Sequence, residues 1–329
     1  MPNVFTALPG LEVPVGGIAS SLAKLWEGEP GSQGTAPSEF RASQMNVVLH
    51  FGLAASEADA RNMFDTVVSF AQRYPCRVVI LCPLSDGSAD PNLSAKIFSE
   101  CYIGQSRQEM SCCEFILLSY PPATRPYLEN QVSICLEGDL PIFYWPHGIK
   151  DGARLADYPY LLKSSKRIII DTSLEPADIS SPLAPFSAKV RDLVYARLLP
   201  VRQSVGQFLS GHAPSVLIDG LTEVIVSHGG SLASEAKWLL KWAIAGLRRC
   251  GVPDQGGPSF QVKLSDGDAA QTLAISFVYK QGGKHFSWKA DLDRGAAIFD
   301  ADFGSGQMTL PVTTHLLKPE AALGEALFF

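Results

Sequence analysis

The sequence predicts an α/β protein, with an N-terminal mixed α/β sheet domain followed by a smaller α+β domain with antiparallel strands. Residues 40–180 alternate short apolar runs with stretches of helical periodicity, as strand–helix–strand units do. Beyond residue 250, apolar and polar residues alternate strictly between Asp-Gly and Gly-Gly pairs, which is typical of antiparallel hairpins. A length of 329 residues fits two domains.

Residues 1–39 are expected to form a helical arm and a linker. Ile18, Leu22 and Leu25 recur at helical spacing. Residues 28–39 are rich in Gly, Pro and Ser, which favours an extended or mobile chain. The helix is therefore expected to dock on the body of the protein or on a partner, and self-association through this arm is an open possibility.

The domain at 40–180 is predicted to build its sheet from both parallel and antiparallel neighbours. A helix with a capping-box start at Ser56 and Asp59 joins its first two strands, so these should be parallel. A short polar turn joins the third and fourth, so these should form a hairpin. The strands are expected at 44–53, 76–82, 94–104, 110–120, 140–145 and 166–173, and the helices at 56–75, 126–136 and 152–165.

The boundary before the domain at 181–329 is predicted within the Pro- and Ser-containing stretch 178–185. The clearest helix of this domain should start at the N-cap Ser231, carry Arg248 and Arg249 in its last turn, and stop at Gly251. Helices are expected at 187–195, 197–210, 231–251 and 319–327, and strands at 216–230 and within 259–267, 271–292 and 296–304.

Composition narrows the class of protein. The formal charge of −6, without a Lys/Arg cluster, argues against a nucleic-acid surface. The N-terminal sequence lacks a signal-peptide pattern, and no apolar run approaches the ~20 residues of a membrane span. These features predict a cytoplasmic protein.

The chain has seven cysteines, an odd number, and most lie in apolar runs. They are expected to be buried, reduced thiols. No paired C-x2-C spacing occurs, so no metal site is predicted, and no cofactor motif is recognised either.

Three ionisable residues follow predicted strands and could share one rim of the sheet. Asp86, His147 and Asp171 would meet there if their strands run parallel, and such rims bind ligands in open α/β sheets. Each residue also has a structural interpretation, because Asp86 precedes a glycine in a turn, Asp171 can cap the next segment, and His147 can be a loop residue. No G-x-S-x-G, G-x-G-x-x-G or P-loop pattern accompanies them.

Arginines form a second candidate site. Arg191, Arg197 and Arg202 lie close together in the sequence near Asp192. A guanidinium suits a phosphate or a partner's carboxylate equally well. The alternative is a solvated helix face with internal ion pairs.

Several stretches occur in an order that resembles the OpcA family, the glucose-6-phosphate dehydrogenase assembly proteins. They are FRASQMNVVL, YPCRVVIL, CCEFILLSY, GDLPIFYWP, RIIIDTS, RDLVYARLLPVRQ and SLASEAKWLLKWAIAGL. The resemblance covers about residues 13 to 250. The family often has two tryptophans where this chain has Tyr144-Trp145, and an aromatic residue where it has Val201.

The resemblance implies a non-catalytic protein that binds glucose-6-phosphate dehydrogenase in the oxidative pentose phosphate pathway and promotes its assembly or activity as an allosteric activator. The positions expected to contact the partner or a ligand are Arg197, Arg202, Trp145, His147, Asp86 and Asp171. The alternative is an enzyme or a nucleotide- or sugar-phosphate-binding protein that uses the rim of Asp86, His147 and Asp171.

Overall fold

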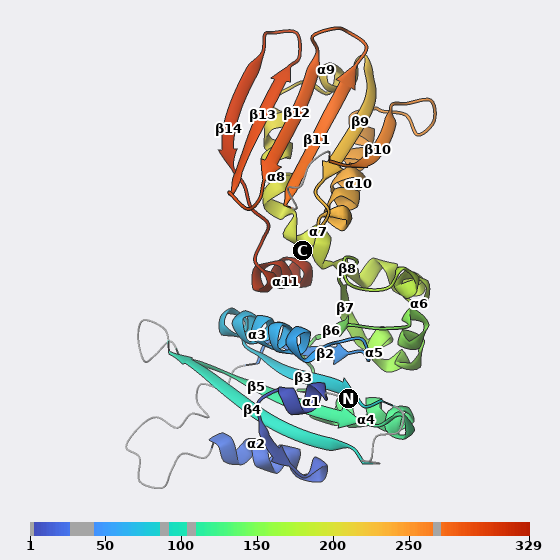
Figure 1. Cartoon of the computed structure of the whole chain (residues 1–329). Helices are drawn as coiled ribbons and strands as arrows, with labels where there is room; N and C mark the ends of the chain where they lie inside the picture. The colour runs from blue at the N-terminus through green and yellow to red at the C-terminus, as the bar shows by residue number, and fades with distance from the viewer. Residues whose placement is uncertain (1–2, 27–42, 86–91, 104–109, 266–270) are drawn as a thin grey trace. The chain divides into compact units, whose positions relative to one another are not determined.

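A computed structural model describes residues 3–26, 43–85, 92–103, 110–265 and 271–329 (Figure 1). The chain forms two compact units, Met1–Leu193 with Leu323–Phe329, and Val194–Ala322. The sequence places a domain boundary at 180/181; which position separates independently folding domains stays a prediction. The expected linker 28–39 lies outside the described residues.

The first unit contains an eight-stranded mixed sheet, which confirms the predicted fold class. Six neighbouring strands in the order β5-β3-β2-β6-β7-β8 are parallel. At one edge, β4 is antiparallel to β5, and β1 is antiparallel to β4. The strands are β1 (Leu11–Val13), β2 (Met45–Phe51), β3 (Cys76–Pro83), β4 (Ser94–Ile103), β5 (Met110–Tyr120), β6 (Ile142–His147), β7 (Ser165–Ile170) and β8 (Val190–Asp192). Every residue of β2 is buried, because helices cover both faces of the sheet.

Two helices of the first unit confirm the sequence signals. Ser56 and Asp59 form the expected capping box. Ile18 and Leu22 are buried in the core of the unit, so the N-terminal helix docks there. The helices are α1 (Val4–Ala7), α2 (Ile18–Trp26), α3 (Glu57–Arg73), α4 (Arg125–Cys135), α5 (Pro159–Ser164) and α6 (Ser180–Leu183), with 3-10 turns η1 (Val15–Gly17), η4 (Pro122–Thr124), η5 (Gly152–Asp157), η6 (Ala177–Ile179) and η7 (Ala184–Lys189).

Two helix predictions were wrong in this part of the chain. The helix expected at 152–165 is split into η5 and α5, because Pro159 disfavours helical backbone at the residue before it. The helix expected at 187–195 is interrupted by β8, which pairs in parallel with β7. A strand of three residues is too short to leave a periodic signal.

The second unit contains a six-stranded sheet in the order β10-β9-β11-β12-β13-β14. Its strands are β9 (Leu221–His228), β10 (Ser259–Leu264), β11 (Thr272–Tyr279), β12 (His285–Asp291), β13 (Ala296–Asp302) and β14 (Met308–Thr313). Its helices are α7 (Leu193–Arg197), α8 (Leu199–Ser210), α9 (Pro214–Ile218) and α10 (Ala233–Arg249), and α11 (Pro319–Phe328) continues into the first unit. Apolar residues of α8 and α10 share a core with alternate residues of the strands.

Three details of this unit correct the sequence analysis. β10 pairs in parallel with β9, not antiparallel, because α10 forms a crossover between them. β14 was not predicted. The N-cap of α10 is Leu232 rather than Ser231, whereas Gly251 has the expected left-handed backbone, with φ +107°.

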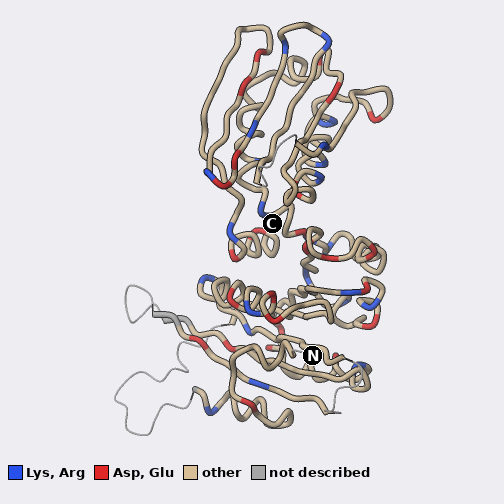
Figure 2. Tube along the Cα trace, in the orientation of Figure 1, with Lys and Arg blue, Asp and Glu red and all other residues tan. Residues whose placement is uncertain are grey.

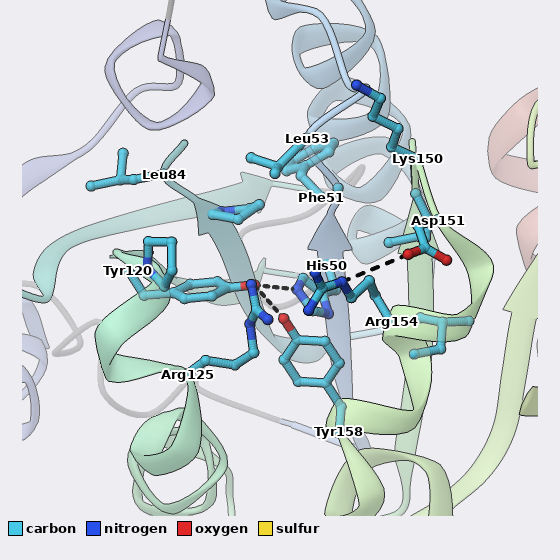
Figure 3. Close-up of a pocket in the computed structure, with 15 residues that line it drawn as sticks. His50, Phe51, Leu53, Leu84, Tyr120, Arg125, Lys150, Asp151, Arg154 and Tyr158 are labelled. Atoms are coloured by element: carbon cyan, nitrogen blue, oxygen red, sulfur yellow. Dashed lines mark hydrogen bonds and ion pairs between the residues drawn. The ribbon is translucent and has the colours of Figure 1, made fainter. Parts of the chain in front are cut away.

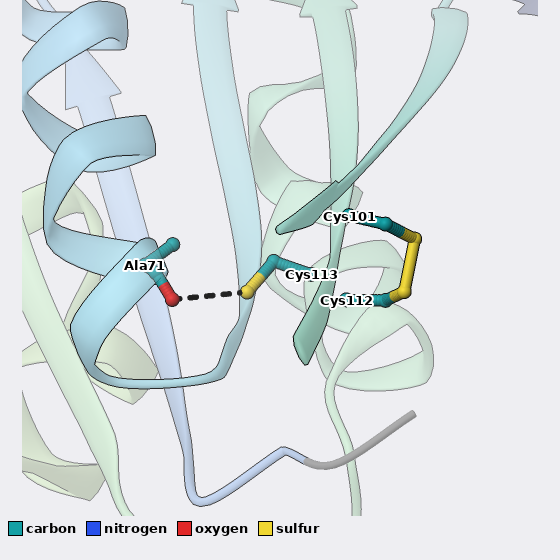
Figure 4. Close-up of a disulfide and its surroundings, with 4 residues drawn as sticks. All are labelled: Ala71, Cys101, Cys112 and Cys113. Carbon is teal, nitrogen blue, oxygen red and sulfur yellow. Dashed lines mark hydrogen bonds between the residues drawn. A yellow bond between two sulfur atoms is a disulfide. The ribbon is translucent and has the colours of Figure 1, made fainter. Parts of the chain in front are cut away.

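The sequence analysis expected all cysteines to be reduced thiols, and this prediction was wrong for two of them. Cys101 and Cys112 form a disulfide between the paired strands β4 and β5 (Figure 4). Cys113, on the opposite face of β5, donates a hydrogen bond to the carbonyl oxygen of Ala71 at 3.3 Å. The free cysteines are Cys76, Cys82, Cys113, Cys135 and Cys250.

Charged residues of both signs are interspersed along the trace of each unit (Figure 2). Within the described ranges, no helix is both long enough and apolar enough to cross a membrane.

Candidate functional site

The carboxyl ends of the parallel strands β2, β3, β5 and β6 lie at one edge of the first sheet, where α/β proteins commonly bind ligands. A cavity of about 410 Å³ opens at this edge (Figure 3). We call it the rim pocket, and it is lined by His50, Phe51, Gly52, Leu53, Pro83, Leu84, Tyr120, Pro122, Arg125, Ile149, Lys150, Asp151, Arg154, Leu155 and Tyr158.

A histidine–tyrosine network forms the base of the rim pocket. His50 Nδ1 lies 2.8 Å from the hydroxyl of Tyr144, and its Nε2 lies 2.8 Å from the hydroxyl of Tyr120. The Tyr120 hydroxyl is in turn 2.8 Å from that of Tyr158, whose ring meets His50 edge-on. A neutral imidazole satisfies this arrangement, because one of its nitrogens donates and the other accepts.

Burial fixes the protonation of this network. It lowers the pKa of His50 to about 3, and the positive charge of Arg125 acts in the same direction. Burial also raises the pKa of Tyr120 and that of Tyr158 above the ordinary tyrosine value. At neutral pH, therefore, His50 is uncharged and both hydroxyls keep their protons.

Basic side chains surround the mouth of the rim pocket. Arg125, at the start of α4, has Nη1 3.2 Å from an oxygen of Asp157. Arg154 lies on η5 and approaches Asp157 and Asp151 only to 3.7 Å. Lys150 is exposed, and its side chain extends away from Arg125 in Figure 3. These cations give the mouth a positive character that the polar but neutral base lacks.

His147 lies at the end of β6, on the face of the sheet opposite His50. Its Nδ1 is 3.7 Å from Oε1 of Glu175 and makes no hydrogen bond with a described residue. Burial lowers the pKa of His147, while Asp59 and Asp171 act against this shift. The ring contacts Phe51 and Trp145 edge-on.

Glu175 connects the segment after β7 to this part of the rim. Its carboxylate accepts hydrogen bonds from the backbone N–H groups of Gly148 at 2.8 Å and Ile149 at 3.0 Å. Burial raises the pKa of Glu175 to about 7, although these two bonds oppose the shift. Glu175 thus holds the loop that passes from His147 into the rim pocket.

The other residues proposed for the rim have structural contacts of their own. Asp171 accepts hydrogen bonds from the backbone N–H and the hydroxyl of Ser173, as its capping interpretation expects. Trp145 is buried in the sheet, with only 2% of its surface exposed. Asp86 lies outside the described residues. Their role as contacts for a partner or ligand stays a prediction.

The two arginines proposed as contacts belong to the second unit. Arg197 donates through Nε to Glu235 at 2.8 Å, and one fifth of its side chain is exposed. Arg202 stacks its guanidinium over the ring of Tyr195, with 3.7 Å between them. Neither contact is the intrahelical ion pair of the alternative, because Glu235 lies on α10 and Arg202 stacks on an aromatic ring. A contact role for the two arginines stays a prediction.

The sequence analysis did not single out His50, Arg125, Arg154 or Tyr158. His50 did carry a signal, since it is the only ionisable residue within the apolar strand 45–51. The cations could not be assigned to the same site, because α4 and η5 are brought together only by the order of the strands.

Several positions that matched the family pattern stabilise the fold. Buried Arg77 donates through Nε to Glu114 at 2.9 Å and pairs with Glu137 at 2.6 Å. Asn46 donates to the backbone oxygen of Glu137 and accepts from its N–H. Asp139 holds a left-handed backbone, with φ 65°, in the turn before β6.

The fold and the rim pocket together define an α/β protein whose mixed sheet is covered by helices and carries a ligand-sized pocket at its rim. Residues 67–184 match the family profile described as "Glucose-6-phosphate dehydrogenase subunit N-terminal domain". Curated relatives named "Putative OxPP cycle protein OpcA" are similar as well. These matches support the resemblance to the OpcA family that the sequence shows.

The Synechococcus elongatus protein is 27% identical over 252 residues, which is 73% of this chain and 55% of the relative. The Nostoc punctiforme protein is 34% identical over 76 residues, or 23% of this chain and 16% of the relative. The chain thus spans about half the length of the first relative.

Two solved structures show a low overall similarity. Glucose-6-phosphate 1-dehydrogenase from Mycobacterium avium has 9% identity and a TM-score of 0.45, with 86% of each chain covered. The 3-ketoreductase KijD10 from Actinomadura kijaniata has 10% identity and a TM-score of 0.42, with 86% of this chain and 88% of that chain covered. Neither similarity supports an inference about function.

Proposed function

We propose that this chain is a non-catalytic effector that binds glucose-6-phosphate dehydrogenase in the cytoplasm and promotes its assembly or activity. The observation that carries the proposal is the family match over residues 67–184, whose description names a subunit of that enzyme. The curated relatives are named for the oxidative pentose phosphate cycle, which is consistent with the same partner.

Activation requires no chemistry from this chain. A partner that binds the active or assembled state of an enzyme more tightly than the other states shifts the population toward it. A coupling free energy of about 1–3 kcal/mol changes activity roughly five- to 150-fold. An ordered scaffold with a rigid contact surface is sufficient for this effect.

Arg197 and Arg202 are our preferred contacts on the second unit. Stacking on Tyr195 and pairing with Glu235 hold the two guanidinium groups in defined positions. Preorganised arginines lose less conformational entropy when they bind a carboxylate. The buried Trp145 and His147 would contribute by shaping the scaffold rather than by direct contact.

The test is a titration of this chain into the dehydrogenase from the same organism, with enzyme activity and size-exclusion chromatography as readouts. We expect a saturable gain in activity and co-elution. We expect Arg202→Gln to raise the half-saturation concentration about tenfold, since an arginine contact contributes on the order of 1–2 kcal/mol to binding. The matched control is Arg294→Gln, whose side chain is 85% exposed and which should leave the titration unchanged.

A variant at the rim separates the effector from the enzyme interpretation. His147→Gln retains a similar volume and a polar group, and it should activate the dehydrogenase as the wild type does. The proposal fails if no complex and no change in activity occur in either reducing or oxidising buffer.

A further inference from the structure

We propose that the rim pocket binds a phosphate monoester of a small hydroxylated metabolite. This inference goes beyond the proposed function, because it concerns a small ligand of the first unit rather than the protein partner. It depends on the shape of the pocket, the cations at its mouth and the neutral polar groups at its base.

The size of the rim pocket suits a metabolite. Its volume of about 410 Å³ lies within the range of roughly 300–1,000 Å³ that small-molecule sites occupy. Leu53, Leu84 and Leu155 provide apolar walls, and His50 with the tyrosines Tyr120 and Tyr158 provides polar groups. Mixed walls of this kind favour a ligand with both a ring and hydroxyl groups over a purely apolar one.

The charges at the mouth favour an anion. Arg125, Lys150 and Arg154 face two carboxylates, those of Asp151 and Asp157. His50 adds no charge, because its pKa is far below neutral. The mouth therefore carries a net positive charge.

Arg125 has spare capacity for an anion. Its Nε is buried and has no hydrogen-bond partner among the described residues, while Nη1 pairs with Asp157. An unsatisfied buried donor is costly, and an oxygen of a ligand would relieve that cost. Arg154 is 64% exposed and only loosely paired at 3.7 Å, so its guanidinium can turn toward the same anion.

A phosphate monoester fits these donors better than a carboxylate does. Its terminal oxygens can accept from two guanidinium groups at once. The hydroxyl of Tyr158 bonds to that of Tyr120 and also interacts with the side chain of Arg125, so it connects the neutral base of the pocket to a cation at its mouth. The phosphate is thus assigned to the mouth and the body of the metabolite to the base.

The experiment is isothermal titration calorimetry of the full chain with two pairs of probes and inorganic phosphate. The pairs are a hexose 6-phosphate with the free hexose, and adenosine 5′-monophosphate with adenosine. We expect at least one ester to bind saturably and at least about tenfold more tightly than both inorganic phosphate and its unphosphorylated counterpart. The ester that binds more tightly identifies the body as a sugar or as a nucleoside.

Variants locate the binding within the rim pocket. Two substitutions should each lower the affinity for the tighter-binding ester about ten- to a hundredfold, Arg125→Gln and Arg154→Gln. This is the loss expected for a charge-assisted hydrogen bond. The matched control is Arg61→Gln on α3, which is 59% exposed and pairs with Glu57 at 3.2 Å but does not line the pocket. Arg154 and Arg61 are both largely exposed, so their replacement should preserve folding.

Three results would overturn the proposal. One is that neither ester binds. The second is that inorganic phosphate or an unphosphorylated counterpart binds as tightly as the esters do. The third is that binding is unchanged in both pocket variants or falls equally in Arg61→Gln. The dehydrogenase is absent from these measurements, so their outcome is independent of the proposed function.

Discussion

Buried polar residues at the rim are the features in which side-chain chemistry departs most from that of an ordinary core. His50 lies near the end of β2 and Glu175 in the segment after β7, and burial affects their pKa values in opposite ways. It keeps His50 uncharged over the whole physiological range, whereas it places the pKa of Glu175 at about 7, within that range. Both groups make stability depend on pH, with opposite signs: for His50 stability rises with pH up to its ordinary pKa of 6.5, whereas for Glu175 it falls as the pH rises toward 7.

The pH dependence of Glu175 has a defined sign. The folded-state pKa of about 7 exceeds its ordinary value of 4.5, so the native state holds the proton more tightly than the unfolded chain. Between these values the native state binds more protons, and stability falls as the pH rises. Relative to that of the wild type, the free energy of unfolding of Glu175→Gln should therefore increase by up to about 3 kcal/mol from pH 5 to pH 8.

Urea unfolding of the wild type and of Glu175→Gln gives the difference in their free energies of unfolding at pH 5 and at pH 8. The prediction concerns how this difference changes between the two pH values. The single oxygen of the Gln amide cannot replace both carboxylate oxygens that accept from Gly148 and Ile149. Glu175→Gln can therefore be less stable than the wild type at pH 5 without contradicting the prediction. Glu12→Gln, at an exposed position of β1, should show no such change. A difference between wild type and Glu175→Gln that is constant with pH would contradict the assignment.

At the scale of elements, the ends of β2 and β6 are joined by an unusually close backbone approach. Gly52 donates to the carbonyl of His147 at 2.7 Å, and Ala54 donates to that of Gly148 at 3.0 Å. A Cβ atom on Gly52 would lie 2.2 Å from the carbonyl oxygen of Gly148. Glycine is therefore required where the chain passes from the strands into the rim pocket.

Gly52→Ala should destabilise the first unit by about 1–3 kcal/mol, since the added methyl group forces backbone atoms apart. Gly16→Ala is the control, because a Cβ atom there meets nothing within 4 Å. Thermal unfolding followed by circular dichroism compares the two. Equal stability of Gly52→Ala and the wild type would show that the strand ends can separate without cost.

Elements with a strong local signal could be predicted from the sequence, and those defined by distant contacts could not. The capping box at Ser56 and the apolar stripe of α3 were sufficient to place that helix. By contrast, β1 and β8 have three residues each and form only because they pair with β4 and β7. The disulfide between Cys101 and Cys112 likewise depends on the register of β4 against β5.

The candidate site followed the same rule. His147 and Asp171 could be assigned to strand ends, since each directly follows an apolar run. The rim pocket could not be predicted, because its cations come from α4, from η5 and from the loop before η5, and its hydroxyls come from β5 and from the junction of η5 and α5. Glu175 was also missed, since its burial depends on the loop after β6.

At the scale of the whole molecule, the chain leaves the first unit at Leu193 and returns to it at Leu323. The returning segment places Phe328 against three aromatic rings of the first unit, those of Phe70, Tyr74 and Phe143. The ring centroid of Phe328 lies 4.8 Å from that of Tyr74 and 6.3 Å from that of Phe70. The first unit is therefore complete only when both ends of the chain are present.

Phe328→Ala should destabilise the first unit by about 1–3 kcal/mol, less than a fully buried phenylalanine would, because 38% of its surface is exposed. Hydrogen exchange followed by mass spectrometry should show faster exchange in peptides of α3, which carries Phe70. Phe329→Ala is the matched control, since Phe329 is 81% exposed and should leave that exchange unchanged. If Phe328→Ala leaves α3 as protected as in the wild type, the returning segment does not stabilise the first unit, and residues 1–193 should then fold alone with undiminished stability.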